Sequence, residues 1–190
     1  LVHIKLEIVE KICVAIGNIR RKPLEINEYL IAFHDEWNKR QKPSDKEFIK
    51  GVVKPDDEIG YWNNFFTSLM TTLGVSSDKE RLVKILAKIY SDARSFECFD
   101  DVHEVLAELK AKSLKLGMLS NAFPSAEEII NRLELKQYFD YILLSYKFEY
   151  IKPEPQIYQF AVETLNVDIK KSIFVDDRWA FVKAAIELEM

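Results

Sequence analysis

An apolar run that ends in two adjacent carboxylates is the feature that most restricts how this chain can fold. Residues 173–175 are Ile, Phe and Val, and they lead directly into Asp176 and Asp177. Apolar residues at helical spacing resume from position 180. This order predicts a short buried strand, a sharp turn and a helix. Because ligands bind at the carboxyl ends of strands in an open α/β sheet, we expect Asp176 and Asp177 to lie at a binding site.

The carboxylate pair has two interpretations. Two adjacent carboxylates repel each other unless they share a cation or a proton. Oxygen ligands of this kind favour a hard ion such as Mg²⁺. The alternative is that Asp176 or Asp177 only caps the next helix, as Asp often does. The polar residues at the ends of the other predicted strands bear on the choice between them.

The chain divides into an all-helical part and an alternating part. Apolar residues at helical spacing predict a helical bundle with helices over about residues 4–19, 26–37, 62–73 and 82–89. From residue 96 onward, amphipathic helices alternate with predicted strands at residues 114–119, 139–144 and 172–175. Such alternation is typical of a parallel sheet with right-handed crossovers. We therefore predict a helical domain at residues 4–95 and an α/β domain at residues 1–3 and 96–190.

The composition argues against several classes of protein. The net charge is −4 and the longest basic run is Arg20-Arg21-Lys22, so nothing indicates binding to nucleic acid. No apolar run approaches the roughly 20 residues of a membrane span, and no signal peptide is visible. The two cysteines, Cys13 and Cys98, lack metal-site spacing. We expect a cytoplasmic protein that binds neither nucleic acid nor membrane.

Polar residues follow all three predicted strands. Ser120 and Asn121 end the first strand, where a hydroxyl and an amide can bind an anionic oxygen together with backbone N–H groups. Lys152 follows the second strand, and the proline after it disfavours helical geometry, so the turn holds a fixed cation. Asp176 and Asp177 follow the third strand. A hydroxyl, a cation and paired carboxylates thus occur in that order.

This order resembles the haloacid dehalogenase (HAD) superfamily. Residues 116–121 are similar to its second motif, a strand that ends in Ser or Thr. The segment Tyr-Ile-Lys-Pro-Glu-Pro around Lys152 is similar to the third motif, and residues 173–178 to the Asp-Asp-Arg variant of the fourth. The likeness covers residues 99–190, while the helical part matches the superfamily's cap in position and type. The resemblance implies a Rossmann-like parallel sheet core with an inserted all-helical cap bundle.

Two features depart from the pattern of the superfamily. No residue matches its first motif, which carries an Asp nucleophile on the central strand. Leu1 and Val2 resemble the residues directly after that motif, so we expect the nucleophile and the central strand to lie before Leu1, and a further core strand to lie beyond Met190. In addition, Phe181 occupies a position where many members have a polar residue, which can remove a ligand near the metal.

The resemblance implies a Mg²⁺-dependent phosphatase that acts on a small phosphorylated metabolite. In such an enzyme an Asp attacks phosphorus to give an aspartyl-phosphate, which water then hydrolyses, and Mg²⁺ offsets the crowded charge. By resemblance, Asp177 is the first metal ligand and Asp176 the second. Ser120 and Lys152 are the catalytic residues, and they bind phosphate together with Asn121. We expect a monomer or a homodimer.

Two other functions compete with the phosphatase. A 2-haloacid dehalogenase of the same fold displaces halide from carbon without a metal. An adjacent acidic pair would repel its carboxylate substrate, which favours the phosphatase. The second competitor is a non-catalytic module that binds Mg²⁺ or phosphate, or an interaction protein, if the protein lacks the first motif altogether.

Three expectations concern the helical part. Aromatic residues at helical spacing favour the core over a substrate pocket; they are Tyr29, Trp37, Tyr61, Trp62, Phe65 and Phe66. A contact of Arg20 or Arg21 with a substrate anion is the less favoured interpretation of those residues. Residues 1–4 and 95–100 link the two predicted domains, and we expect them to act as a hinge that admits substrate.

Overall fold

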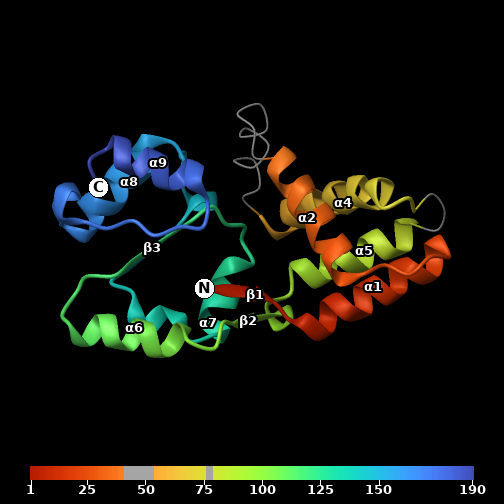
Figure 1. Cartoon of the computed structure of the whole chain (residues 1–190). Helices are drawn as coiled ribbons and strands as arrows, with labels where there is room; N and C mark the ends of the chain where they lie inside the picture. Colours follow the sequence, from red (N-terminus) through yellow and green to blue (C-terminus); the bar gives the residue numbers. More distant parts are fainter. Residues whose placement is uncertain (41–53, 76–78) are drawn as a thin grey trace. The chain divides into compact units, whose positions relative to one another are not determined.

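The computed structural model describes residues 1–40, 54–75 and 79–190. These residues form two compact units (Figure 1). The N-terminal unit contains residues 1–99 and 124–133, and the C-terminal unit contains residues 100–123 and 134–190. The two units resemble the predicted domains, but residues 124–133 pack with the helical part. The domain boundaries drawn from the sequence therefore stay a prediction.

The N-terminal unit combines helices with one short ribbon. Its helices are α1 (Leu6–Arg20), α2 (Ile26–Lys39), α4 (Pro55–Thr72), α5 (Lys79–Tyr90), the 3-10 turn η2 (Ala93–Ser95) and α7 (Ala126–Arg132). Strand β1 (Val2–Ile4) pairs antiparallel with β2 (Phe96–Cys98), so that His3 lies opposite Glu97. The two segments that we expected to act as a hinge are therefore hydrogen-bonded to each other.

Helix α4 begins earlier than the apolar spacing predicts. Pro55 occupies its first turn, where a missing N–H costs nothing. The Asp57 carboxylate accepts a hydrogen bond from the Lys54 N–H at 3.0 Å, which satisfies one of the backbone donors at the start of the helix. Apolar spacing cannot mark such a polar first turn. The helix ends at Thr72, and Gly74 follows the C-cap residue Leu73 with a φ of +76°, in the left-handed region that glycine adopts without strain.

An aromatic core stabilises the N-terminal unit. Tyr29, Tyr61, Trp62, Phe65 and Phe66 are all buried, which confirms the prediction that they belong to the core. Trp37 is half-buried and stacks on Trp62 with ring centroids 6.0 Å apart. Aromatic side chains bury the largest apolar area per residue, and ring pairs in tilted or offset geometry stabilise the fold further.

A buried pair of tyrosines makes the stability of this unit depend on pH. The hydroxyls of Tyr29 and Tyr90 lie 3.0 Å apart, and burial raises the pKa of both well above the usual value. Unfolded tyrosines lose their protons near pH 10, according to their ordinary pKa of about 10. Above that pH the unfolded chain binds fewer protons than the folded one, so stability falls as pH rises. We expect urea midpoints to drop more steeply above about pH 10 in the wild type than in Tyr90→Phe. The exposed-site variant Tyr150→Phe is the control, and equal slopes in all three proteins would contradict the prediction.

The C-terminal unit alternates helices with a parallel strand pair. Its elements are α6 (Val102–Ala111), β3 (Gly117–Ser120), η3 (Leu135–Tyr138), β4 (Tyr141–Leu144), η4 (Ser145–Lys147), α8 (Pro155–Leu165), η5 (Ile169–Lys171) and α9 (Trp179–Glu187). β3 and β4 pair in parallel with Ser120 opposite Leu144. A Cβ at Gly117 would lie 2.7 Å from the Leu165 Cδ1, so α8 packs closely on β3. The first two predicted strands are therefore confirmed, with later starts.

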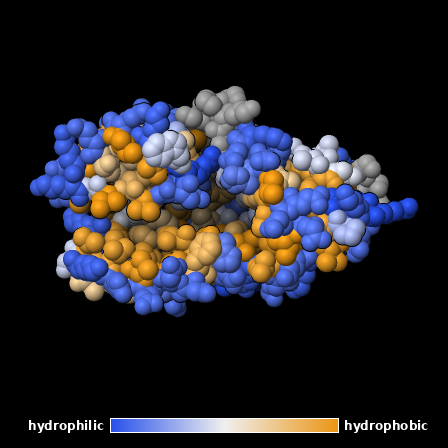
Figure 2. Space-filling model, in the orientation of Figure 1, coloured by the Kyte–Doolittle hydropathy of each residue, from blue (hydrophilic) through white to orange (hydrophobic). Residues whose placement is uncertain are grey.

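The prediction of a third strand at residues 172–175 is wrong. Among the described residues, this segment pairs with no other strand. A strand exists only when its backbone groups bond to a neighbour, and no ladder includes this segment within the described ranges. Phe174 packs against the core of the unit, whereas Ile173 is 90% exposed and Val175 is 85% exposed. Figure 2 shows apolar surface, in orange, over the C-terminal unit. Successive side chains of this segment nevertheless point alternately to the core and to solvent, as they do in a half-buried strand.

Two expectations drawn from composition can be compared with the structure. Neither Cys13 nor Cys98 is in a disulfide, and Cys13 is buried. Among the helices of the described ranges, none combines the length and the apolar character that crossing a bilayer requires.

Candidate functional site

Hydrogen bonds bring together the polar residues at the ends of the three predicted strands. The Asn121 Oδ1 accepts the backbone N–H of Lys152 at 2.7 Å, and the Asn121 Nδ2 donates to the Lys152 carbonyl at 2.8 Å. The Lys152 Nζ in turn donates to the Asp176 Oδ2 at 2.6 Å. Ser120 precedes Asn121 directly, and Asp177 follows Asp176. All five predicted site residues thus lie on three segments that are bonded to one another.

Lys152 is a buried cation. Its side chain is 7% exposed, and desolvation lowers its pKa although the Asp176 carboxylate opposes that shift. The ammonium also faces two aromatic rings, with the Nζ 5.5 Å from the centre of Phe174 and 4.9 Å from that of Phe181. Aromatic faces attract cations. Phe181 therefore supplies a ring to Lys152 where the superfamily often has a polar side chain.

The two carboxylates have different surroundings. Asp176 is nearly buried and accepts hydrogen bonds from Lys152 and from the backbone N–H of Arg178 at 2.9 Å. Asp177 is exposed, and no described residue is hydrogen-bonded to its carboxylate. Arg178 occupies the N-cap position of α9 and no side chain caps that helix. The interpretation that Asp176 or Asp177 is a helix cap is therefore wrong.

The donor set suits a hard cation only in part. Throughout the ranges that the structure describes, no three His, Cys, Asp or Glu side chains are grouped so that they could hold a metal ion. Mg²⁺ commonly takes one or two carboxylates from a protein and completes its shell with water and phosphate oxygens. Asp177 fits that pattern because its oxygens are exposed, whereas Asp176 is engaged by Lys152. Of the two carboxylates, Asp177 is therefore the one whose oxygens a cation could reach.

Asn121 and Ser145 shape the segment after β3. Both ends of the Asn121 amide are engaged by the Lys152 backbone, so the backbone N–H and the second Nδ2 hydrogen of Asn121 remain for a phosphate contact. The buried Ser145 accepts the Ala122 N–H through its Oγ at 3.1 Å. Sequence patterns did not single out Ser145. Its position directly after β4, like that of Ser120 at the end of β3, is the signal that could have found it.

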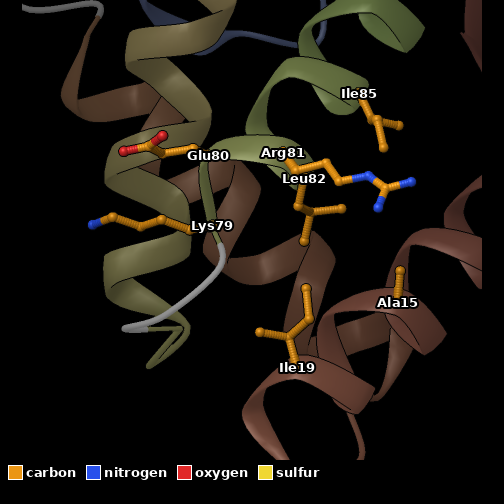
Figure 3. Close-up of a pocket in the computed structure, with 7 residues that line it drawn as sticks. All are labelled: Ala15, Ile19, Lys79, Glu80, Arg81, Leu82 and Ile85. Carbon is orange, nitrogen blue, oxygen red and sulfur yellow. The ribbon is translucent and has the colours of Figure 1, made fainter.

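The cap residues considered for substrate binding belong to the N-terminal unit. Arg20 donates to the Glu28 carboxylate at 2.7 Å and to backbone carbonyls, so its guanidinium is already occupied within the N-terminal unit. A hollow of about 800 Å³ lies between α1 and α5 (Figure 3). The residues that line it are Ala15, Ile19, Lys79, Glu80, Arg81, Leu82 and Ile85. None of the predicted site residues lines this hollow.

Comparison with known proteins identifies the family. The model of the haloacid dehalogenase-like hydrolases matches residues 6–188, which is nearly the whole chain. The chain belongs to this family. Its fold is accordingly the HAD-like α/β fold that the sequence predicts.

Proteins similar to this chain carry the names of both enzyme classes considered above. It is 36% identical over 86 residues to the phosphorylated carbohydrates phosphatase of Thermotoga maritima, covering 44% of this chain and 39% of that protein. L-2-haloacid dehalogenase from Xanthobacter autotrophicus, solved with chloropropionic acid covalently bound, aligns with a TM-score of 0.63 at 21% identity, over 95% of this chain and 69% of that one. A HAD family enzyme from Bacteroides thetaiotaomicron, in complex with magnesium and inorganic phosphate, aligns with a TM-score of 0.58 at 18% identity, over 100% and 86%. These two structures show the fold alone.

The chain is short beside its curated relatives. Its alignments cover 15%, 48% and 39% of the length of three of these relatives. The activity, substrates and partners of the whole protein are therefore matters for proposal.

Proposed function

We propose that this HAD-like hydrolase is a Mg²⁺-dependent phosphatase of small phosphorylated metabolites. The observation that carries the proposal is the contrast within the acidic pair. Asp176 binds the buried Lys152, whereas the adjacent Asp177 presents free oxygens to solvent. An ammonium and an available carboxylate side by side suit a metal-bound phosphate, whose charges need both a cation and an anchor for the metal.

Each residue of the site would have its own role. The Ser120 hydroxyl donates a hydrogen bond to a phosphoryl oxygen, and the Asn121 backbone N–H donates a second. Lys152 balances the negative charge of phosphate and nucleophile, held in place by Asp176 and by the Asn121 amide. Asp177 holds Mg²⁺, which when bound offsets the charge crowding at the phosphate. The mechanism also requires a nucleophilic Asp, the residue that the first motif of the superfamily supplies.

The proposal is tested by phosphate release from a panel of sugar and nucleotide monophosphates. The protein is produced from its full reading frame, and its intact mass is read against residues 1–190. We expect turnover with Mg²⁺ and none with EDTA. Asp177→Asn should lower kcat/KM by roughly 10²-fold or more, since one metal ligand loses its charge. The matched control is Glu187→Gln, an exposed carboxylate on α9 whose loss should leave the rate unchanged. The proposal is rejected if the rate of phosphate release is the same with Mg²⁺ and with EDTA, and the same in wild type and Asp177→Asn.

The dehalogenase remains a second candidate because of one feature of the site. Lys152 neutralises Asp176, which leaves a single free carboxylate, Asp177, to repel a carboxylate substrate. That repulsion is weaker than two free carboxylates would give. Halide release from a 2-chloro acid, without added metal, would identify this activity. A protein that lacks the first motif and releases neither phosphate nor halide would point instead to a non-catalytic module that binds Mg²⁺ or phosphate.

We also propose a cytoplasmic location and a monomer or homodimer as the functional form. The free cysteines support a reducing compartment. Sedimentation of the purified protein distinguishes the two oligomeric states.

A further inference from the structure

An aromatic ring in the first turn of α9 lies against the buried cation of the site. The centre of the Phe181 ring is 4.9 Å from the Lys152 Nζ and 4.7 Å from the Arg178 Cζ. Phe181 is only 6% exposed, and Lys152 is 7% exposed. The attraction between a cation and the face of a ring is strongest where water is excluded. Phe181 can therefore act on Lys152 through electrostatics as well as through packing.

The backbone that carries this ring is held on both sides. The Phe181 N–H donates to the Arg178 carbonyl at 2.9 Å, within the first turn of α9. The Phe181 carbonyl accepts from the hydroxyl of Tyr158 at 2.9 Å, and Tyr158 lies on α8 without exposed surface. Lys152 and these residues all belong to the C-terminal unit. The ring that faces the ammonium is thus fixed within the same unit.

The hydrogen bond to Asp176 restrains the Lys152 ammonium at one point. An ammonium has three N–H donors, and one of them donates to the Asp176 Oδ2 at 2.6 Å. A single bond of this kind sets a distance, but the flexible four-carbon stem of a lysine can still move about it. The rings of Phe181 and Phe174, with centres 4.9 Å and 5.5 Å from the Nζ, restrict that movement. Carboxylate and rings together therefore leave the ammonium few orientations.

We propose that Phe181 is a positioning residue for Lys152 and acts through the attraction between its ring and the ammonium. Ring and carboxylate hold the ammonium in one orientation, in which the N–H groups that are not bonded to Asp176 can donate to an anion. The consequence for catalysis rests on the phosphatase proposed above. The restraint on Lys152 does not, so the two can be tested apart.

Fluorinated phenylalanines at position 181 separate the charge distribution of the ring from its shape. Fluorine withdraws electron density from the face of the ring, so one, two and three fluorines weaken its attraction for a cation step by step and change its volume little. A ring that acted by packing alone would not respond in this graded way. Phe181→Leu removes the ring and keeps an apolar side chain. The control is the same fluorinated series at Phe148, whose ring packs on that of Phe160 with centroids 5.0 Å apart.

NMR of the Lys152 side chain is the first measurement, made without substrate on the protein from its full reading frame. The Lys152 signals are assigned by their loss in Lys152→Arg. We expect the Lys152 Hε protons to be shifted upfield by the neighbouring rings, and Phe181→Leu to reduce that shift by roughly half, since Phe174 remains. The amplitude of motion at the Lys152 Cε, from carbon relaxation, should rise with each fluorine at position 181. Urea midpoints should stay at the wild-type value in the fluorinated proteins, which excludes loss of the fold as the cause.

The outcomes separate positioning from packing. Lys152 motion that rises with each fluorine at position 181, and does not change with fluorine at position 148, supports the proposal. Equal Lys152 motion throughout the series at position 181, or an equal rise in both series, would overturn it.

A second set of proteins distinguishes the two cations that lie near the ring. In an Arg178→Gln background, fluorine at position 181 should still raise the motion of Lys152, because the ring contacts the Lys152 Nζ independently of the guanidinium. If the effect disappears in that background, the ring acts on Lys152 only through Arg178 and the proposal is overturned.

Binding of inorganic phosphate and phosphate-release kinetics then show whether the restraint serves the site. With three fluorines at position 181 we expect the Kd of inorganic phosphate to rise and kcat/KM to fall, each roughly fivefold. If wild type neither binds nor releases phosphate, the proposed function fails while the NMR data still decide the role of Phe181. If wild type is active and the fluorinated proteins match it, positioning for catalysis is overturned.

Discussion

Replacing Asp176 with alanine is expected to lower the free energy of unfolding of the C-terminal unit by about 3–5 kcal/mol, because it leaves the buried Lys152 without its partner. The two side chains are 7% and 11% exposed, so water cannot readily replace the lost carboxylate. Desolvation already lowers the pKa of Lys152, and the loss of Asp176 removes the main interaction that opposes that shift. Urea unfolding followed by circular dichroism measures the change.

Two further variants show whether the pair itself causes the loss. Asp177→Ala removes the exposed neighbour and should change stability by no more than about 0.5 kcal/mol. Replacing the pair as a unit, with Lys152→Met and Asp176→Leu, should recover most of the stability, since apolar side chains of similar volume often substitute for a buried ion pair. Equal losses in Asp176→Ala and Asp177→Ala would show that the contact between Lys152 and Asp176 contributes nothing measurable.

Phe65→Ala is expected to destabilise the N-terminal unit by about 3–5 kcal/mol, the usual cost of deleting a fully buried aromatic side chain. Phe65 has no exposed surface, and its ring lies 4.9 Å from that of Phe33 and 5.2 Å from that of Phe66. Its removal leaves a cavity among rings that cannot all move inward. Tryptophan fluorescence during urea unfolding reports on this unit, because Trp37 and Trp62 pack beside Phe65.

An exposed apolar residue of the same unit provides the control for Phe65. Ile31 on α2 is 64% exposed, so Ile31→Ala should leave the unfolding midpoint nearly unchanged. An unchanged midpoint in Phe65→Ala as well would mean that the aromatic core does not determine the stability of this unit.

Local patterns account for the parts of the structure that could be predicted. Helices such as α1 and α8 can be predicted because the spacing of apolar residues within the helix itself indicates them. The order of Ser120, Lys152 and Asp176 also predicted the site, because the carboxyl ends of parallel strands meet at one edge. The first turn of α4 was missed because it consists of polar residues that carry no apolar period.

The segment 172–175 shows where local reasoning fails. Its Ile, Phe and Val have the composition of a strand, and its side chains alternate between core and solvent. A strand, however, is a property of two backbones, and the described residues provide no neighbour for this one. Composition alone could not reveal that.

The sequence by itself determined the family, the helical and alternating parts and the polar residues at the predicted strand ends, which hydrogen bonds bring together, because motifs and periodicity are encoded in short stretches of chain. Only the tertiary structure distinguished Asp176, which binds the buried Lys152, from its chemically identical neighbour Asp177, which faces solvent. Only the tertiary structure brought the ring of Phe181 to Lys152. Both depend on burial and on contacts between distant segments, and a pattern of neighbouring residues contains neither.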